Sequence, residues 1–269
     1  MQQSCTSGTP SATLGIQPTE GFAFDADGNL WCAVRGQGVV GYSSGDLTQD
    51  GFPPEFWLLG GPDMFIDEGS PSDLAFDSQG FLWVAHGSDL LAFSPSSRLA
   101  SLDGGVDGGT SLAGLIITSP CMVPDAGPST CHASAFTFLK IAFDGAGNLW
   151  ATVLISGDEL EYGVVVYSRS QLETAAIDEP SPTLVLSIKG YQVWSLAFDQ
   201  DGNLWTGAYP IPFPFGDDAG PPHLYRFSRT DLEIIDGGLR KPDVILTLPV
   251  EPSESLAFSP IPSNLPIQP

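Results

Sequence analysis

The decapeptide FAFDADGNLW (residues 22–31) recurs along the 269-residue chain. Its further copies are LAFDSQGFLW (74–83), IAFDGAGNLW (141–150), LAFDQDGNLW (196–205) and a degraded LAFS (256–259). The copies lie 52, 67, 55 and 60 residues apart, measured between Phe24, Phe76, Phe143, Phe198 and Phe258. Self-similarity at periods of this size is the signature of a repeat architecture.

Two further phrases accompany each complete copy. The first is an aromatic-Ser pair followed within a few residues by leucine, at 42–47, 93–99, 167–172 and 227–232. The second is a β-rich run before the next copy, at 55–59, 115–118, 183–188 and 243–248. We interpret each unit as four short strands, with Asp-x-x-Gly-Asn as the hairpin turn, because Gly and Asn tolerate positive φ.

Four-stranded units repeated along a chain predict an all-β fold, a β-propeller with very little helix. We expect five blades. The fifth would be a composite, because 10–16 resembles a fourth strand and 256–268 supplies a first strand and a weak second one. Pairing the two ends would close the ring and remove exposed sheet edges. Residues 1–9 would be a polar tether and 10–269 a single propeller domain; a fragment of a longer chain is the alternative.

Composition excludes some partners. Lys and Arg number 9 against 32 Asp and Glu, which gives a net charge of −23. Nucleic acids and anionic membranes both need clustered cations, so neither is expected as a partner. No apolar run approaches the roughly 18 residues of a membrane span.

The cysteines suggest an oxidising compartment. There are four, an even number, and Cys121 and Cys131 bracket a short loop that a disulfide would staple. With so few cations, we expect an extracellular or cell-envelope protein. Cys5 precedes a polar stretch typical of a lipidated cysteine, while a cloning remnant or a Cys5–Cys32 disulfide are the alternatives.

The repeat AFDxxGNLW resembles that of the NHL, streptogramin-lyase and gluconolactonase-like propeller superfamily, over about residues 20–250. The resemblance implies the fold more than the function, because the repeat residues build strands and turns. Gluconolactonase-like enzymes hold a catalytic divalent metal at the channel mouth, and Glu20-Gly21 resembles their first ligand phrase. The family's Asn and Asp phrases are missing, and Leu139 and Trp194 stand where polar ligands would be needed. No His phrase matches the streptogramin lyases.

Most variation in loop length falls on the face that carries the loops from second to third strand and from one unit to the next. Such loops on a rigid scaffold usually carry binding groups. The alternative is that they only tolerate insertion, with their aromatic rings packed onto the ring of blades. The candidate ligand-binding residues there are His86, Tyr191, Trp194, Tyr209, Phe213, Phe215 and His223.

The first strands of a propeller surround a central channel. Aligning these strands brings Glu254, Glu20 and Asp73 to the mouth of that channel from three consecutive blades. Converging carboxylates suit a hard cation such as calcium. The alternative, which we favour, is a solvated acidic rim partly neutralised by Lys140.

Three hypotheses for the function follow. The first is a secreted or envelope-attached, non-enzymatic binding module, a monomer, that recognises a protein or a saccharide through the long-loop face. The second is a divalent-metal hydrolase or lyase that uses Glu20, Asp73 and Glu254, with His86 or His223 as general base. The third is an architectural module of a larger surface protein.

Overall fold

The computed structural model describes residues 19–48, 56–60, 70–102, 114–118, 136–155, 161–175, 180–188, 191–211, 221–232 and 240–248. These residues form 16 strands in four antiparallel four-stranded sheets, with a short helix between the third and fourth strands of each sheet. In every sheet, strands that are consecutive in sequence are paired, so each sheet is a meander. The prediction of an all-β fold with little helix is confirmed.

The strands begin and end close to the predicted phrases. The first sheet holds β1 (Thr19–Phe24), β2 (Leu30–Val34), β3 (Gly38–Tyr42) and β4 (Phe56–Gly60). The second holds β5 (Pro71–Phe76), β6 (Leu82–His86), β7 (Asp89–Phe93) and β8 (Leu115–Thr118). The third holds β9 (Phe136–Phe143), β10 (Leu149–Ile155), β11 (Glu161–Tyr167) and β12 (Thr183–Ile188). The fourth holds β13 (Tyr191–Phe198), β14 (Leu204–Pro210), β15 (His223–Phe227) and β16 (Val244–Thr247).

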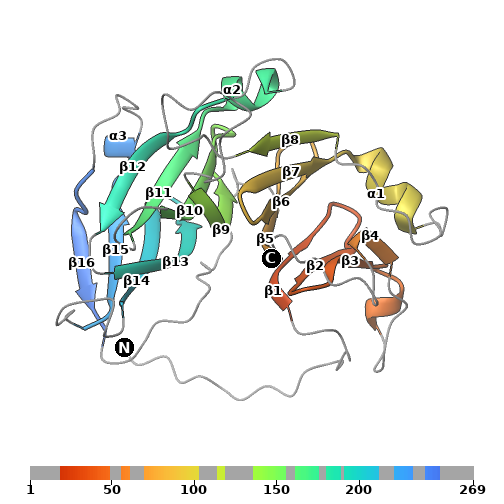
Figure 1. The fold of residues 1–269 in the computed structure, drawn as a ribbon, viewed down its shortest axis with the longest axis horizontal. Coiled ribbons are helices and arrows are strands. Elements are labelled where there is room, and N and C mark those ends of the chain that lie inside the picture. The colour runs from red at the N-terminus through yellow and green to blue at the C-terminus, as the bar shows by residue number, and fades with distance from the viewer. Residues whose placement is uncertain are drawn as a thin grey trace, which may run out of the picture.

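The first strands of successive sheets lie next to one another: β1 contacts β5, β5 contacts β9, and β9 contacts β13. Figure 1 shows the sheets following one another in an arc, from the first sheet at the right to the fourth at the left. The first strand of each sheet is therefore the innermost. The segments of the proposed fifth blade, 10–16 and 256–268, and the tether 1–9 lie outside the described residues. The five-blade ring and the domain bounds thus stay predictions.

The aspartate of each repeat closes the turn between the first and second strands. Asp25 Oδ1 accepts the backbone N–H groups of Asp27 at 3.0 Å and Asn29 at 2.9 Å, while its Oδ2 accepts the indole N–H of Trp31 at 3.1 Å. The same three bonds recur in the other repeats, at Asp77, Asp144 and Asp199. One carboxylate therefore shapes the hairpin and also fixes the tryptophan ring.

The glycine and asparagine of the repeat have separate roles. Gly147 has φ 85°, a region that a side chain disfavours, and no described non-glycine residue has positive φ. Asn148 acts through its side chain: Nδ2 donates to Asp144 Oδ2 at 2.8 Å, and Oδ1 accepts the N–H of Arg169 at 2.9 Å. The asparagine thereby ties the hairpin to the segment after the third strand.

The second repeat departs from this arrangement in two places at once. Phe81 replaces the asparagine, and Pro95, which has no N–H, stands where Arg169 stands in the third repeat. The second repeat therefore lacks both the side-chain acceptor at position 81 and the backbone donor at position 95 that this hydrogen bond would need.

A short helix follows the third strand of each sheet. These helices are η1 (Asp46–Thr48), α1 (Pro95–Leu102), α2 (Arg169–Thr174) and α3 (Arg229–Leu232). Ser168 forms the N-cap of α2 in a capping box with Gln171, which satisfies donors at the start of the helix. The aromatic-Ser phrase thus marks both the end of a strand and the start of a helix.

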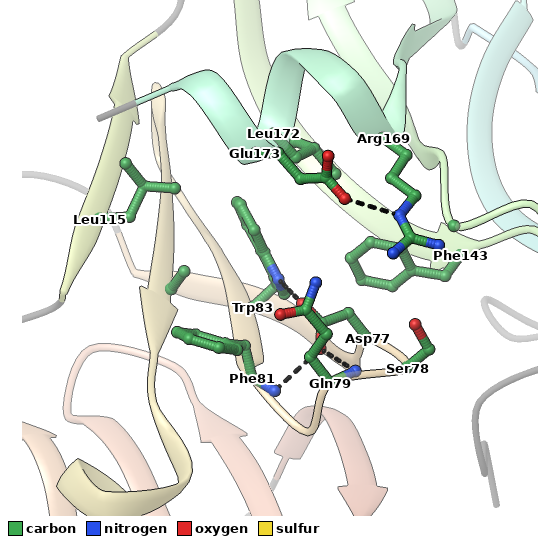
Figure 2. Close-up of a pocket in the computed structure, with 12 residues that line it drawn as sticks. Asp77, Ser78, Gln79, Phe81, Trp83, Leu115, Phe143, Arg169, Leu172 and Glu173 are labelled. Atoms are coloured by element: carbon green, nitrogen blue, oxygen red, sulfur yellow. Dashed lines mark hydrogen bonds and ion pairs between the residues drawn. The ribbon is translucent and has the colours of Figure 1, made fainter. Parts of the chain in front are cut away.

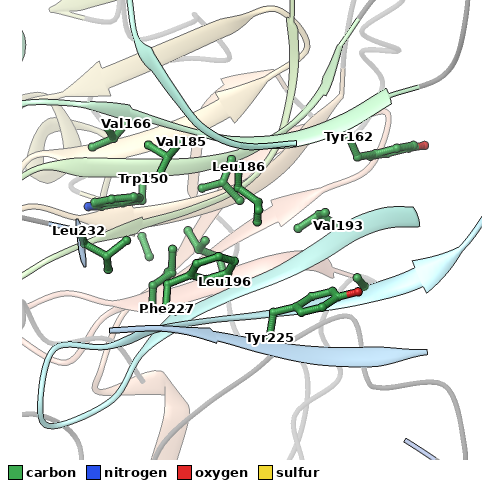
Figure 3. Packing of buried hydrophobic residues seen from close by; sticks show 14 of the residues in the cluster. Trp150, Tyr162, Val166, Val185, Leu186, Val193, Leu196, Tyr225, Phe227 and Leu232 are labelled. Carbon is green, nitrogen blue, oxygen red and sulfur yellow. The ribbon is translucent and has the colours of Figure 1, made fainter. Parts of the chain in front are cut away.

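The repeat tryptophans pack between neighbouring sheets. Trp83 meets Phe143 edge to face with ring centroids 6.1 Å apart, and Trp150 meets Phe198 in the same way at 5.9 Å. Figure 3 shows Trp150 of the third sheet packed close to Leu232 and Phe227 of the fourth. Each such aromatic pair adds about 0.5–1.5 kcal/mol beyond area burial. The repeat therefore encodes the contact between sheets as well as the turn.

Candidate functional site

A break in strand pairing recurs at the same place in every first strand. The register shifts where β1 pairs β2, β5 pairs β6, β9 pairs β10 and β13 pairs β14. A bulge of this kind bends the strand and re-aims its side chains, and bulges are common beside functional sites. The residues passed over in the pairing are Glu20, Ser72, Leu139 and Trp194, each four positions before the phenylalanine of its repeat.

Lys140 follows the bulge of β9 and crosses to two other sheets. Its Nζ donates to the carbonyl oxygen of Glu20 at 2.6 Å and to that of Ser72 at 3.3 Å. The residue is only 7% exposed. Lys140, which we expected to neutralise a solvated acidic rim, is therefore buried and links the inner strands of three sheets.

Asp73 is held at the same place. Its Oδ2 accepts the N–H of Ile141 on β9 at 2.9 Å, and a Cβ added at Gly21 on β1 would collide with its Oδ1. Burial raises the pKa of Asp73 to about 6, opposed by the charge of Lys140 and by backbone N–H donors, that of Ile141 foremost. The carboxylate therefore bonds the third sheet and lies against the backbone of the first.

Glu20 points to a different partner. Its Oε1 lies 3.6 Å from Nη1 of Arg35, a residue in the turn after β2 whose side chain is 80% exposed. Within the described part of the chain, no group of three His, Cys, Asp or Glu side chains is placed to hold a metal ion. Glu254, the third predicted ligand, lies outside that part. A calcium site formed by Glu20, Asp73 and Glu254 therefore stays a prediction.

Two of the predicted ligand-binding residues meet at the end of the fourth sheet. The rings of Tyr191 and His223 have centroids 5.5 Å apart, and His223 continues to Tyr225 at 5.6 Å. His223 Nδ1 lies 3.4 Å from Thr247 Oγ1. Tyr191 and His223 are half-buried, so each leaves part of its surface to solvent.

Trp194 and Tyr209 belong to the same end of this sheet. The indole N–H of Trp194 donates to Gln192 Oε1 at 2.7 Å, and Gln192 is paired with Tyr209. Paired residues of an antiparallel ladder share a face, and alternation puts Tyr191 on the other one. The predicted aromatic residues are thus divided between the two faces of one sheet end.

Among the remaining predicted binding residues that the structure describes, His86 is not brought to this group. It lies in the second sheet, where it pairs with Asp89 in the strand ladder; its Nε2 is buried and has no hydrogen-bond partner among the described residues. Burial lowers the pKa of His86, opposed by the charge of Asp89. Phe213, Phe215 and the proposed disulfide Cys121–Cys131 lie outside the described residues. Cys32 is a buried free thiol, and burial raises its pKa to about 12.

Arg98 is a residue that sequence reasoning missed. Its Nη1 lies 3.1 Å from Asp25 Oδ2, and its guanidinium carbon stands 4.6 Å from the centroid of Phe76 and 5.5 Å from that of Trp31. The sequence does indicate this residue, through its position relative to the aromatic residue that ends the third strand. Arg98 comes five residues after its strand-ending aromatic, where the other repeats have leucine, and the leucine of the second repeat, Leu99, comes one residue later.

A cavity of about 270 Å³ lies between the second and third sheets, at the end that carries the aspartate turns (Figure 2). A wider hollow of about 570 Å³ adjoins it, with Asp25, Asp77 and Asp144 among the residues that line it. Both lie at the opposite end of the strands from the predicted binding face. The cavity is lined by Trp83, Phe81, Phe143, Leu115, Leu172, Ala92, Gly147, Asp77, Ser78, Gln79, Arg169 and Glu173.

Comparison with known proteins identifies similarity in fold. No protein-family model matches the sequence, and no curated protein matches it. Among solved structures, a calcium structure of a Trichoderma reesei protein of carbohydrate-active enzyme family AA12 superimposes with a TM-score of 0.53 at 15% identity, over 79% of this chain and 52% of that one. That score, together with four meanders whose first strands adjoin, decides the architecture. The chain has a β-propeller fold.

Two further propeller structures match less closely. PorZ of Porphyromonas gingivalis, described as a surface component of the type-IX secretion system, gives a TM-score of 0.45 at 16% identity, over 88% of this chain and 28% of PorZ. A candidate gluconolactonase gives 0.42 at 12% identity, over 78% of this chain and 70% of that one. The propeller described here spans less than two thirds of the length of the first solved structures that it matches. None of the described helices has the length and apolar character needed to cross a bilayer.

Proposed function

We propose that this propeller is a secreted or envelope-attached, non-enzymatic module that binds a protein or a saccharide through the face carrying the longer loops. The contact between Tyr191 and His223 is the observation that supports this most directly. Two rings held against each other at the end of a rigid blade offer a preorganised apolar surface. Such surfaces are suited to partners that present flat or ring-shaped groups.

The polar side chains on the inner strands also favour a binding module over an enzyme. Asp73 already bonds the Ile141 N–H, and the ammonium of Lys140 is bound to two carbonyl oxygens. Groups occupied in this way hold blades together, whereas a hydrolase needs an acid or base that can reach a substrate. We therefore prefer the binding module to the metal-dependent enzyme.

Glycan binding on an array tests the saccharide partner, with wild-type protein and the variants Tyr191→Ala and Tyr209→Ala. We expect each variant to weaken binding about tenfold, the loss of one aromatic contact. Ile116→Ser is the control, because Ile116 is exposed on another blade. Glycan signals that are equal in all four proteins would reject this partner class.

Site-specific photo-crosslinking tests the protein partner. A photoreactive phenylalanine analogue at position 209 should yield a discrete adduct in culture of the producing cells, while the same analogue at position 116 should not. Absence of an adduct at 209, together with negative glycan data, would overturn the proposed function.

A further inference from the structure

The interface between the first and second blades contains an arginine. Arg98 extends from α1 so that its guanidinium lies close to the rings of Phe76 and Trp31. Its Nη1 lies 3.1 Å from the carboxylate of Asp25, the turn aspartate of the preceding blade, and Nη2 donates to the carbonyl of Gly80 at 2.7 Å. Both charged side chains are less than a tenth exposed.

The cavity between the second and third blades has the same walls without the arginine. Trp83 takes the place of Trp31, Phe143 that of Phe76, and Asp77 that of Asp25. The residue at the position of Arg98 is Leu172, which is half-buried and reaches no carboxylate. Figure 2 shows Trp83, Asp77 and Phe143 around the space below Leu172. The cavity is therefore the counterpart of a site that a guanidinium fills one blade earlier.

Asp77 also has fewer donors than its counterparts. In the third and fourth repeats, Oδ2 of the aspartate accepts both from the tryptophan and from the asparagine, as Asp144 does from Trp150 and Asn148. Phe81 replaces that asparagine in the second repeat, so among the described residues Oδ2 of Asp77 receives only the indole N–H of Trp83, at 3.0 Å. A carboxylate oxygen accepts more than one hydrogen bond, so this one has capacity left.

The next interface shows that leucine can close the same space. Leu232 is 7% exposed and belongs to the cluster that contains Trp150 and Phe198. Leu172 leaves a cavity of about 270 Å³, so the second interface has neither the arginine of the first nor the tight apolar packing of the third.

We propose that this cavity binds the guanidinium of an arginine side chain presented by a protein partner, in the position that Arg98 occupies one blade earlier. A planar guanidinium can lie against an aromatic face while it donates to a carboxylate, which a lysine ammonium does less well. Arg169 at the rim is paired with Glu173 at 2.8 Å, and no cation among the described residues forms a hydrogen bond with Asp77. The net charge of −23 favours the approach of a basic segment.

This site is independent of the proposed long-loop binding face, because it lies at the other end of the strands. Titration of the isotope-labelled chain with N-acetyl-arginine amide tests it, with the indole N–H resonance of Trp83 as the readout. We expect a saturable shift. N-acetyl-citrulline amide has the same shape without the charge and should bind about tenfold more weakly, since it loses a charge-assisted hydrogen bond.

Three variants make the test specific. Leu172→Arg should fill the cavity from within, as Arg98 does, and abolish the shift of the Trp83 resonance. Asp77→Asn should weaken binding about tenfold or more, while Asp144→Asn, which alters the same acceptor one blade later, should leave the affinity within about twofold. An unsaturable shift, equal binding of the citrulline compound, or a shift that persists with both Leu172→Arg and Asp77→Asn would overturn the proposal.

Discussion

The ammonium of Lys140 donates to the carbonyl oxygen of Glu20 at 2.6 Å, although the two residues belong to first strands two blades apart. The same group reaches Ser72 on the blade between them, beside the carboxylate of Asp73. An ammonium carries three donors and no acceptor, so it can serve several carbonyl groups at once. Three blades are thereby joined at their inner edge by one buried cation.

Replacing Lys140 with methionine should destabilise the protein by about 3 kcal/mol at neutral pH, because the half-buried carboxylate of Asp73 would lose the nearby cation and the carbonyl oxygens of Glu20 and Ser72 would lose their donor. Denaturant unfolding measures the change. Lys241→Met is the matched control, since Lys241 is exposed, and it should change stability by less than about 0.5 kcal/mol. Equal stability of the two variants would show that the Lys140 contacts contribute nothing.

Asp73 should make the protein less stable as pH rises from about 4 to about 6. Its pKa is raised from 3.8 to about 6, so between these values the folded state binds more protons than the unfolded state. Stability from this group is complete below the lower value, falls as pH rises and is constant above the higher one. The difference in melting temperature between the wild type and Asp73→Asn should follow this course. Taking the difference removes the opposite trends that other carboxylates contribute to both proteins. A flat difference would contradict the raised pKa.

The repeat predicts the strands, the hairpin turns and the succession of sheets, because these depend on residues close together in sequence. Asp25 and Trp31 are examples, since the hydrogen bonds that shape the hairpin join residues of one turn. The position of Lys140 could not be predicted in the same way, because its acceptors are carbonyl groups of two other blades. The cavity beside Trp83 is also a property of two blades together. Of the contacts between blades, only that of Arg98 is indicated in the sequence, because Arg98 stands where the other repeats have leucine.

The two aspartates of the fourth turn should differ sharply in their effect on stability. Asp199 accepts backbone bonds from Asp201 and Asn203 as well as the indole N–H of Trp205, whereas the side chain of Asp201 is exposed. Asp199→Ala should cost about 2–3 kcal/mol, because it leaves several donors without an acceptor. Asp201→Ala in the same turn should cost less than about 0.5 kcal/mol. Denaturant unfolding of the two single variants tests this, and similar losses would contradict the assigned role of the repeat aspartate.

Replacing Arg98 with leucine, the residue at this position in the other repeats, should destabilise the protein by about 2–3 kcal/mol. Burial acts to raise the pKa of Asp25, but hydrogen bonds from Asn29 and Trp31 and the charge of Arg98 outweigh it, so the pKa lies below its usual value. Without Arg98 the carboxylate stays buried and loses its cation, which costs more than the pair itself gains.

A double-mutant cycle with Asp25→Asn separates the ion pair from the packing of Arg98 on the two rings, and we expect coupling of about 1–2 kcal/mol. Arg169→Leu is the control, because its pair with Glu173 is exposed and worth less than about 0.5 kcal/mol. If Arg98→Leu proved as stable as the wild type, a guanidinium in this position would have no energetic advantage over leucine. The argument for a guanidinium in the cavity one blade later would then lose its template.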